Sequence, residues 1–114
     1  FINDMVKVKI CCISSIEEAR LAVAYGAAAI GLVGRMPSGP GIITDELIHA
    51  IAKTVPPPIQ TFLLTSETTV KGIYNHYQKT RTTTIQLVDE IEKGGHARLK
   101  NFCLIWKLFK YYMF

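Results

Sequence analysis

The chain has 114 residues, of which 49% are hydrophobic, and it carries a formal net charge of +4. This length allows one small domain or part of a larger one, and the hydrophobic content excludes an intrinsically disordered chain. Lysine and arginine are scattered along most of the sequence, without the basic stripe and interleaved aromatic residues of a nucleic-acid-binding surface. No apolar run is long enough to cross a membrane. We therefore expect neither a nucleic-acid partner nor a membrane partner.

The three cysteines, Cys11, Cys12 and Cys103, give an odd count without metal-ligand spacing such as CxxC. They suggest neither a disulfide framework nor a metal site. This cysteine usage fits a reducing compartment, and no export signal is visible, so we expect a cytoplasmic protein.

An alternation of apolar and polar side chains predicts a β-strand that begins at Met5. Its two faces carry Val6, Val8 and Ile10 on one side and Lys7, Lys9 and Cys11 on the other. Cys11 ends the strand just before a turn into a helix, the position where parallel α/β proteins place their reactive groups. A cysteine in a strand is more often a small buried hydrophobic residue. A face that bears lysine is not a dry core, however. If it lines a barrel, Lys9 needs an acidic partner and its charge favours a thiolate at Cys11.

The next elements follow from caps and apolar runs. Ser14 or Ser15 is the predicted N-cap of a helix that begins at Ile16 and ends at Gly26. Residues 27–33 form a short apolar run typical of a strand buried on both sides.

Residues 34–41 hold three glycines and two prolines, which predicts a loop. Because it lies between a strand and a helix, this loop belongs at the active-site end of a parallel fold. It lacks the P-loop and GxGxxG patterns, so its signal for phosphate binding is weak. Thr44 then caps a second helix, which the three prolines at 56–58 terminate.

The second half of the pattern repeats the first. A third strand is predicted at 59–64, followed by a helix over 69–78 that Ser66 caps. His76 lies in the last turn of this helix, and we expect a solvated or C-terminal helix histidine there and not a ligand. A fourth strand covers 83–87, and Asp89 and Glu90 open a fourth helix. Strands that alternate with helices at this spacing predict right-handed βαβ units around a parallel sheet.

The pattern changes near Lys93. Residues 100–114 hold the only tryptophan, three of the five phenylalanines and two of the five tyrosines. This tail fits an amphipathic helix, a fifth strand or residues read out of frame, and we favour the last. We therefore divide the chain into upstream residues 1–4, a half-barrel at 5–93 and a divergent tail at 94–114.

Three stretches of the sequence resemble the N-terminal half of phosphoribosylanthranilate isomerase. Residues 8–14 read Val-Lys-Ile-Cys-Cys-Ile-Ser, where the family has Val-Lys-Ile-Cys-Gly-Ile-Thr. Residues 24–33 form a second stretch similar to the family, and residues 84–87 look like the start of its Gln-Leu-His-Gly strand. The first motif is fairly specific, whereas the others would not identify the family alone.

The resemblance implies a (β/α)8 TIM-type barrel, of which this chain covers about the first four βα units. It also implies an isomerase of tryptophan biosynthesis that needs no cofactor and acts on a small sugar-phosphate substrate by an Amadori rearrangement. Cys11 matches the general base of the family, and the matching motifs suggest Lys9, Ser38 and Gln86 as substrate-binding residues. An aspartate on a later strand acts as general acid in the family. The paired roles suit the reaction, since proton transfer from the sugar C2 needs one base and one acid.

Three departures from the family pattern leave other functions open. Cys12 replaces a glycine, Val88 a histidine and Pro40 an arginine that binds substrate. They favour a divergent branch, such as another sugar-phosphate isomerase or lyase on the same barrel. A half-barrel also exposes two sheet edges, so we expect a fragment that is inactive alone and self-associates, or a non-catalytic interaction module.

Overall fold

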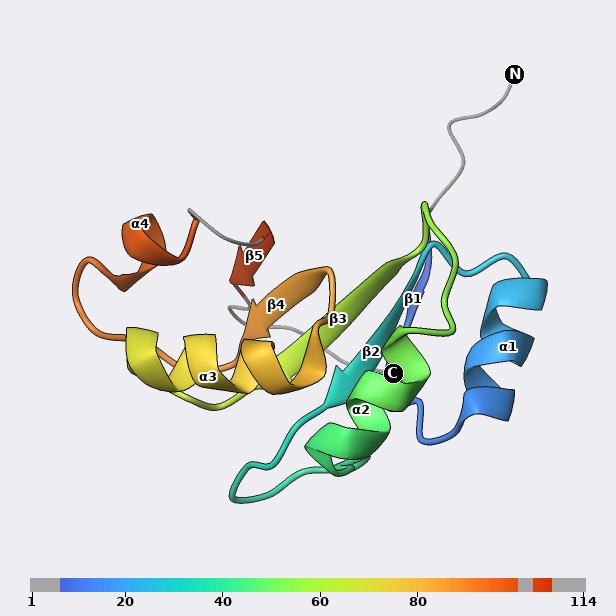
Figure 1. Ribbon diagram of the computed structural model, residues 1–114, viewed down its shortest axis with the longest axis horizontal. Coiled ribbons are helices and arrows are strands. Elements are labelled where there is room, and N and C mark those ends of the chain that lie inside the picture. The colour runs from blue at the N-terminus through green and yellow to red at the C-terminus, as the bar shows by residue number, and fades with distance from the viewer. Residues whose placement is uncertain (1–6, 101–103, 108–114) are drawn as a thin grey trace.

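The computed structural model describes residues 7–100 and 104–107 of the chain. They form a parallel five-stranded sheet in which the strands lie in sequence order (Figure 1). The strands are β1 (Lys9–Ile10), β2 (Ala29–Val33), β3 (Gln60–Thr65), β4 (Thr84–Leu87) and β5 (Leu104–Lys107). The helices are α1 (Ile16–Ala24), α2 (Asp45–Ala52), α3 (Val70–Thr80) and α4 (Gly95–Leu99).

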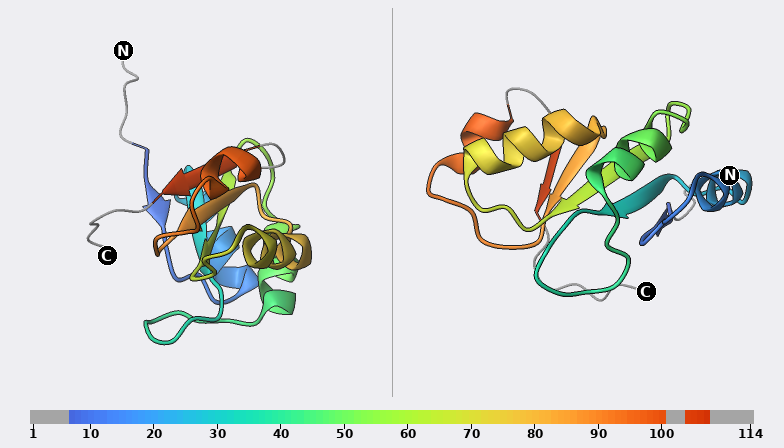
Figure 2. Two further views of the ribbon diagram at one scale, coloured as in Figure 1. Left: turned by 90° about the vertical axis from the view of Figure 1, so that its left-hand side faces the viewer. Right: turned by 60° about the horizontal axis from the view of Figure 1, so that its bottom comes forward.

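Successive strands are neighbours in the sheet, and each pair is parallel. Right-handed crossovers between such neighbours put their helices on one face. Figure 2 shows α1, α2 and α3 along the same side of the strands. This is the winding of a (β/α)8 barrel, so the fold class predicted from the sequence is confirmed, with the described strands forming part of such a barrel.

The sheet has a helix-covered outer face and an opposite inner face. Alternate strand residues on the outer face are buried beneath the helices, and the larger cluster joins Ile30, Leu32 and Leu63 to Ile48 and Ile51 of α2. Each of these five side chains is almost fully buried. Transfer of such side chains from water is the main stabilising contribution to the packing of the helices.

The first two helices begin as predicted. The Ser15 hydroxyl accepts a hydrogen bond from the backbone N–H of Glu18 at 3.0 Å, and Glu18 accepts in return from the N–H of Ser14 at 2.7 Å. Thr44 caps α2 by accepting from the N–H of Leu47 at 3.2 Å. Both caps satisfy N–H groups that lack partners within the helix.

Two predicted helix starts are wrong. The cap of α3 is Thr69, not Ser66, since the Thr69 hydroxyl accepts from the N–H of Gly72 at 3.0 Å. Asp89 and Glu90 open no helix. The chain instead continues to Gly94, whose φ of 78° is in the left-handed region, and α4 begins after it.

Of the three alternatives for the tail, the fifth strand is the one that residues 104–107 form. The other residues of the tail from 101 onward lie outside the described ranges. The proposed upstream residues 1–4 lie outside them as well. No helix within the described residues is long and apolar enough to span a membrane.

Candidate functional site

Cys11 lies at the carboxyl end of β1, on the inner face of the sheet. Its side chain passes over Gly31 of β2, where an added Cβ would be only 2.8 Å from the Cys11 Sγ and 3.2 Å from its Cα. The backbone N–H of Ile13 donates to the carbonyl of Gly31 at 3.1 Å and fixes this approach. A glycine on β2 is therefore the condition for the thiol to lie where it does.

Lys9 and Gln86 meet on the same inner face. The Lys9 Nζ donates to the Gln86 Oε1 at 2.5 Å, and it lies 4.9 Å from the centroid of the Phe62 ring. Gln86 is only 1% exposed, so its amide cannot rely on water for a partner. Among the described contacts the acceptor for Lys9 is thus an amide, where the sequence suggested a carboxylate.

Burial dominates the electrostatics of Lys9 and Cys11. It raises the pKa of the Cys11 thiol, and the positive charge of Lys9 opposes this with a smaller effect. It also lowers the pKa of the Lys9 ammonium, against the smaller opposing effects of Cys11 and Cys12. The prediction that Lys9 favours a thiolate is correct in sign, but the net shift goes the other way because desolvation is larger.

Cys12 has a φ of 61°, the left-handed conformation that glycine adopts more readily. Its Sγ donates to the carbonyl of Pro40 at 3.8 Å. An added Cβ at Gly41 would lie 2.8 Å from both the Cβ and the Sγ of Cys12. The loop after β2 therefore packs directly against the residue that follows Cys11.

The structure brings together three of the four predicted site residues. Lys9, Cys11 and Gln86 share the inner face, whereas Ser38 is exposed on the loop after β2. The described hydrogen bonds include none between Ser38 and the other three.

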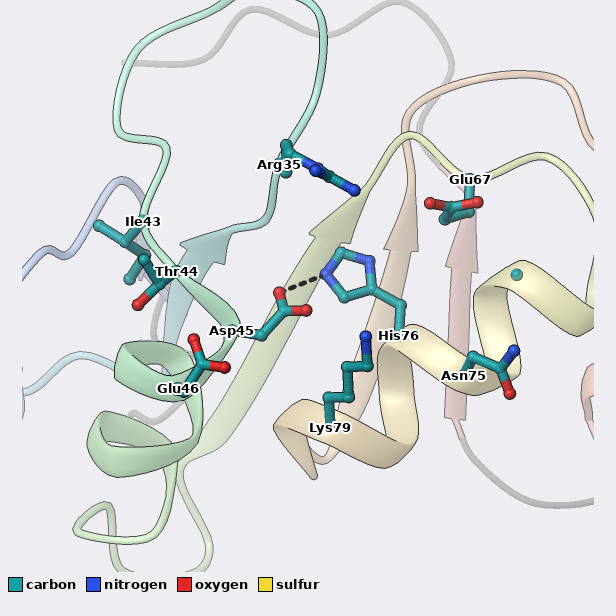
Figure 3. A pocket seen from close by; sticks show the side chains of 10 residues that line it. Arg35, Ile43, Thr44, Asp45, Glu46, Glu67, Asn75, His76 and Lys79 are labelled. Carbon is teal, nitrogen blue, oxygen red and sulfur yellow. Dashed lines mark hydrogen bonds and ion pairs between the residues drawn. The ribbon is translucent and has the colours of Figure 1, made fainter.

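A separate cavity of about 500 Å³ lies between α2 and α3, lined by residues that include Arg35, Asp45, His76 and Lys79 (Figure 3). His76 is 8% exposed, so the solvated alternative is wrong, whereas its place in the C-terminal half of α3 agrees with the other alternative. The spacing Ile73, His76, Thr80 puts it on the buried stripe of α3 and was the signal that sequence reasoning missed. Within residues 7–100 and 104–107, no three His, Cys, Asp or Glu side chains are grouped to hold a metal ion.

Comparison with known proteins identifies relatives of one kind, although no family model matches the chain. The chain is 34% identical over 82 residues to N-(5'-phosphoribosyl)anthranilate isomerase 2 of Methanosarcina mazei, and the aligned region covers 71% of this chain and 36% of that protein. It is 46% identical over 57 residues to the N-(5'-phosphoribosyl)anthranilate isomerase of Pelobacter propionicus, covering 50% of this chain and 27% of that protein.

Solved structures agree with these sequences. The phosphoribosyl anthranilate isomerase of Thermus thermophilus superposes with a TM-score of 0.83 at 26% identity, over 93% of this chain and 52% of that one. The phosphoribosyl anthranilate isomerase of Thermotoga maritima superposes with a TM-score of 0.81 at 26% identity, over 90% of this chain and 50% of that one. The resemblance found in the sequence is confirmed, and the chain spans about half the length of these structures and less of the curated relatives.

Proposed function

We propose that this chain supplies the N-terminal half of a phosphoribosylanthranilate isomerase, with Cys11 as the general base. The observation that carries the proposal is the position of the Cys11 thiol, on the inner face at the carboxyl end of β1 and against Gly31. In barrels of this type, the carboxyl ends of the strands carry the reacting groups. The similarity to isomerases of this kind in sequence and in fold supports the same reading.

In the proposed reaction, the general acid protonates the ring oxygen of N-(5-phosphoribosyl)anthranilate as its bond to C1 breaks, and the nitrogen lone pair forms a protonated imine between the anthranilate nitrogen and C1. The Cys11 thiolate takes the proton from C2, and the electron pair of that C–H bond becomes the C1–C2 double bond as the nitrogen is neutralised. The resulting enol then becomes the ketone of the ribulosyl product. A thiol whose pKa is raised by burial is the stronger base once it is deprotonated.

Lys9 and Gln86 bind the substrate in this proposal, and Ser38 acts from the loop after β2. Lys9 is half-buried, so an anionic oxygen of the substrate would add an opposite charge beside its amide acceptor and offset the cost of burying the ammonium. Gln86, on β4, orients the ammonium of Lys9 through their hydrogen bond. The general acid and the remaining ligands come from strands that this half does not contain, so the isolated chain is inactive and uses the rest of the barrel as its partner.

One observation favours a different substrate on the same site. The carbonyl of Pro40 is engaged by Cys12, which packs the loop against the turn beside the base. Pro40 also takes the place of an arginine in the family, and Val88 of a histidine. The second candidate is therefore another sugar-phosphate isomerase or lyase.

The proposal is tested in a complete barrel, made by joining this chain after β5 to the C-terminal half of a related isomerase. Turnover is followed as the loss of fluorescence of the anthranilate adduct. We expect Cys11→Ala to lower turnover by about 100-fold or more with an unchanged circular dichroism spectrum, whereas Cys12→Ala keeps it within a few-fold. Unaltered turnover in Cys11→Ala rejects Cys11 as the base. Turnover only of other sugar phosphates supports the second candidate.

A further inference from the structure

The imidazole of His76 touches three separate segments of the chain. Its Nδ1 lies 2.8 Å from the hydroxyl of Thr65, the last residue of β3. Its Nε2 lies 2.9 Å from the Oδ1 of Asp45, the first residue of α2, as Figure 3 shows. The third contact is with Gly34, where an added Cβ would be 2.4 Å from Cε1 and 2.7 Å from Nε2 of the ring.

One arrangement of protons satisfies the polar atoms of this cluster. The Thr65 Oγ1 accepts from the backbone N–H of Glu67 at 3.2 Å, which leaves its own hydrogen to donate to Nδ1 of His76. The Nε2–H of the imidazole then donates to Asp45. Thr65 is fully buried and His76 nearly so, and a buried network with all its hydrogen bonds made holds its members in one geometry.

Gly34 and Asp45 stand at the two ends of one loop, residues 34–44, which joins β2 to α2. The first end is also fixed by the N–H of Gly34, which donates to the carbonyl of Leu64 at 2.9 Å. The far part of the loop carries Ser38 and lies against Cys12 through Pro40. The backbone also joins the two ends directly, since the N–H of Ile43 donates to the carbonyl of Val33 at 3.0 Å, and His76 adds a side-chain contact to this bond.

We propose that His76 is a positioning residue that clamps both ends of loop 34–44 and so holds Pro40 against Cys12, beside Cys11. The clamp lies on the helix side of the sheet, whereas Lys9, Cys11 and Gln86 lie on the inner face. It therefore acts on the site only through the loop. The proposal is separate from the isomerase function, and its test requires no turnover.

The test compares amide hydrogen exchange in the native chain and in His76→Leu, which keeps a buried side chain but removes both hydrogen bonds. We expect exchange in residues 34–44 to rise about tenfold or more, because each lost buried hydrogen bond is worth about a tenfold change in local opening. Alkylation of Cys12 by iodoacetamide should rise with it. Amides of β2 and β3 should exchange at their native rates.

The control on the same two helices is His49→Leu, at an exposed position. This histidine lies on α2, and its Nδ1 is 3.3 Å from the carbonyl of Thr80 on α3. It ties the same two helices together without touching the loop, so we expect native exchange in residues 34–44. A rise of equal size in the control, or a rise shared by the loop and the strands, would show that His76 only stabilises the fold.

Two further comparisons keep the proposal testable if His76→Leu fails to fold. Thr65→Ser keeps the hydroxyl and should leave loop exchange native, whereas Thr65→Val removes it and should raise loop exchange. Gly34→Ala should loosen the loop in the native background, and most of this effect should vanish on a His76→Ala background, where only the Leu64 carbonyl, 3.2 Å from the added Cβ, still crowds it. Equal behaviour of the two Thr65 variants, or additive effects of the Gly34 and His76 changes, would overturn the clamp.

Discussion

The Nζ of Lys9 lies 2.5 Å from the Oε1 of Gln86, although the two residues stand on β1 and β4 with two strands between them. A flat sheet would hold these side chains too far apart, since neighbouring strands are about 4.8 Å apart. The contact therefore depends on the curvature of the sheet. It ties the first strand of the half-barrel to the fourth across the face that bears Cys11.

Gln86→Leu tests how much this contact contributes. The substitution leaves the half-buried ammonium of Lys9 without its amide acceptor, so we expect the free energy of unfolding to fall by about 1–3 kcal/mol. The measurement is urea denaturation followed by circular dichroism. Gln78→Leu on α3 is the matched control, and we expect it to stay within about 0.5 kcal/mol of the native chain. Equal losses in both variants would contradict a specific role for the contact.

Most elements of the fold could be predicted because their signals are local. Ser15 and Thr44 cap helices at the positions where the sequence places them. Ser66 and Thr69 are both hydroxyl residues near the start of an apolar stripe, so the sequence pattern alone does not identify the cap of α3. Only the backbone geometry decides between them, since a cap must be extended while its hydroxyl reaches an N–H three residues on.

The site was partly predictable for the same reason. Strand alternation puts Lys9 and Cys11 on one face, and this needs no knowledge of other strands. The contact of Lys9 with Gln86 depends on residues 77 positions apart, and the hydrogen bonds of His76 depend on Asp45 and Thr65. No local pattern encodes these distances, which follow from how the helices and strands pack.

The reactivity of Cys11 should depend on the charge of Lys9. Burial raises the pKa of the thiol and Lys9 lowers it, so removing the charge leaves the effect of burial unopposed. We expect Lys9→Met to slow the alkylation of Cys11 by iodoacetamide several-fold at pH 8, because less of the thiol is ionised. Peptide mass spectrometry separates Cys11 from the other cysteines by residue-specific modification.

Lys7→Met is the control for this prediction. This substitution removes the same formal charge, but Lys7 is exposed, and water and salt screen an exposed charge strongly. The rate of alkylation at Cys11 should therefore stay near the native rate.

In the native protein, the rate of alkylation of Cys11 should still be rising at a pH above the usual pKa of a cysteine. An early plateau would contradict the raised pKa.

Cys12 and Gly41 should be coupled in stability. A non-glycine residue in the left-handed region costs about 1–2 kcal/mol, so Cys12→Gly should be more stable than Cys12→Ala by about 1 kcal/mol. Gly41→Ala should lose about 1–3 kcal/mol, because Gly41 has a φ of 82° and its new Cβ would meet Cys12. Part of that loss should vanish on a Cys12→Gly background. Strict additivity in urea denaturation would show that the two residues do not meet.

The open edge at β1 should make the isolated chain self-associate. Apolar side chains are exposed there on the strand and on α1, with Leu21 at 58% and Tyr25 at 82%, and they line a cavity of about 370 Å³. Together with the unpaired backbone groups of an edge strand, this surface is of the kind that binds a second chain. Sedimentation velocity of the native chain should therefore show concentration-dependent dimers or larger species.

Tyr25→Lys tests whether this surface carries the association. A charge in place of an exposed aromatic side chain should weaken association by about tenfold or more if Tyr25 is buried between two chains. Tyr74→Lys is the matched control, since Tyr74 is also partly exposed but lies on α3, away from the β1 edge. A native chain that sediments as a monodisperse monomer would reject self-association. Association that Tyr25→Lys leaves unchanged would place the contact elsewhere, and the open edge at β5 would be the next surface to alter.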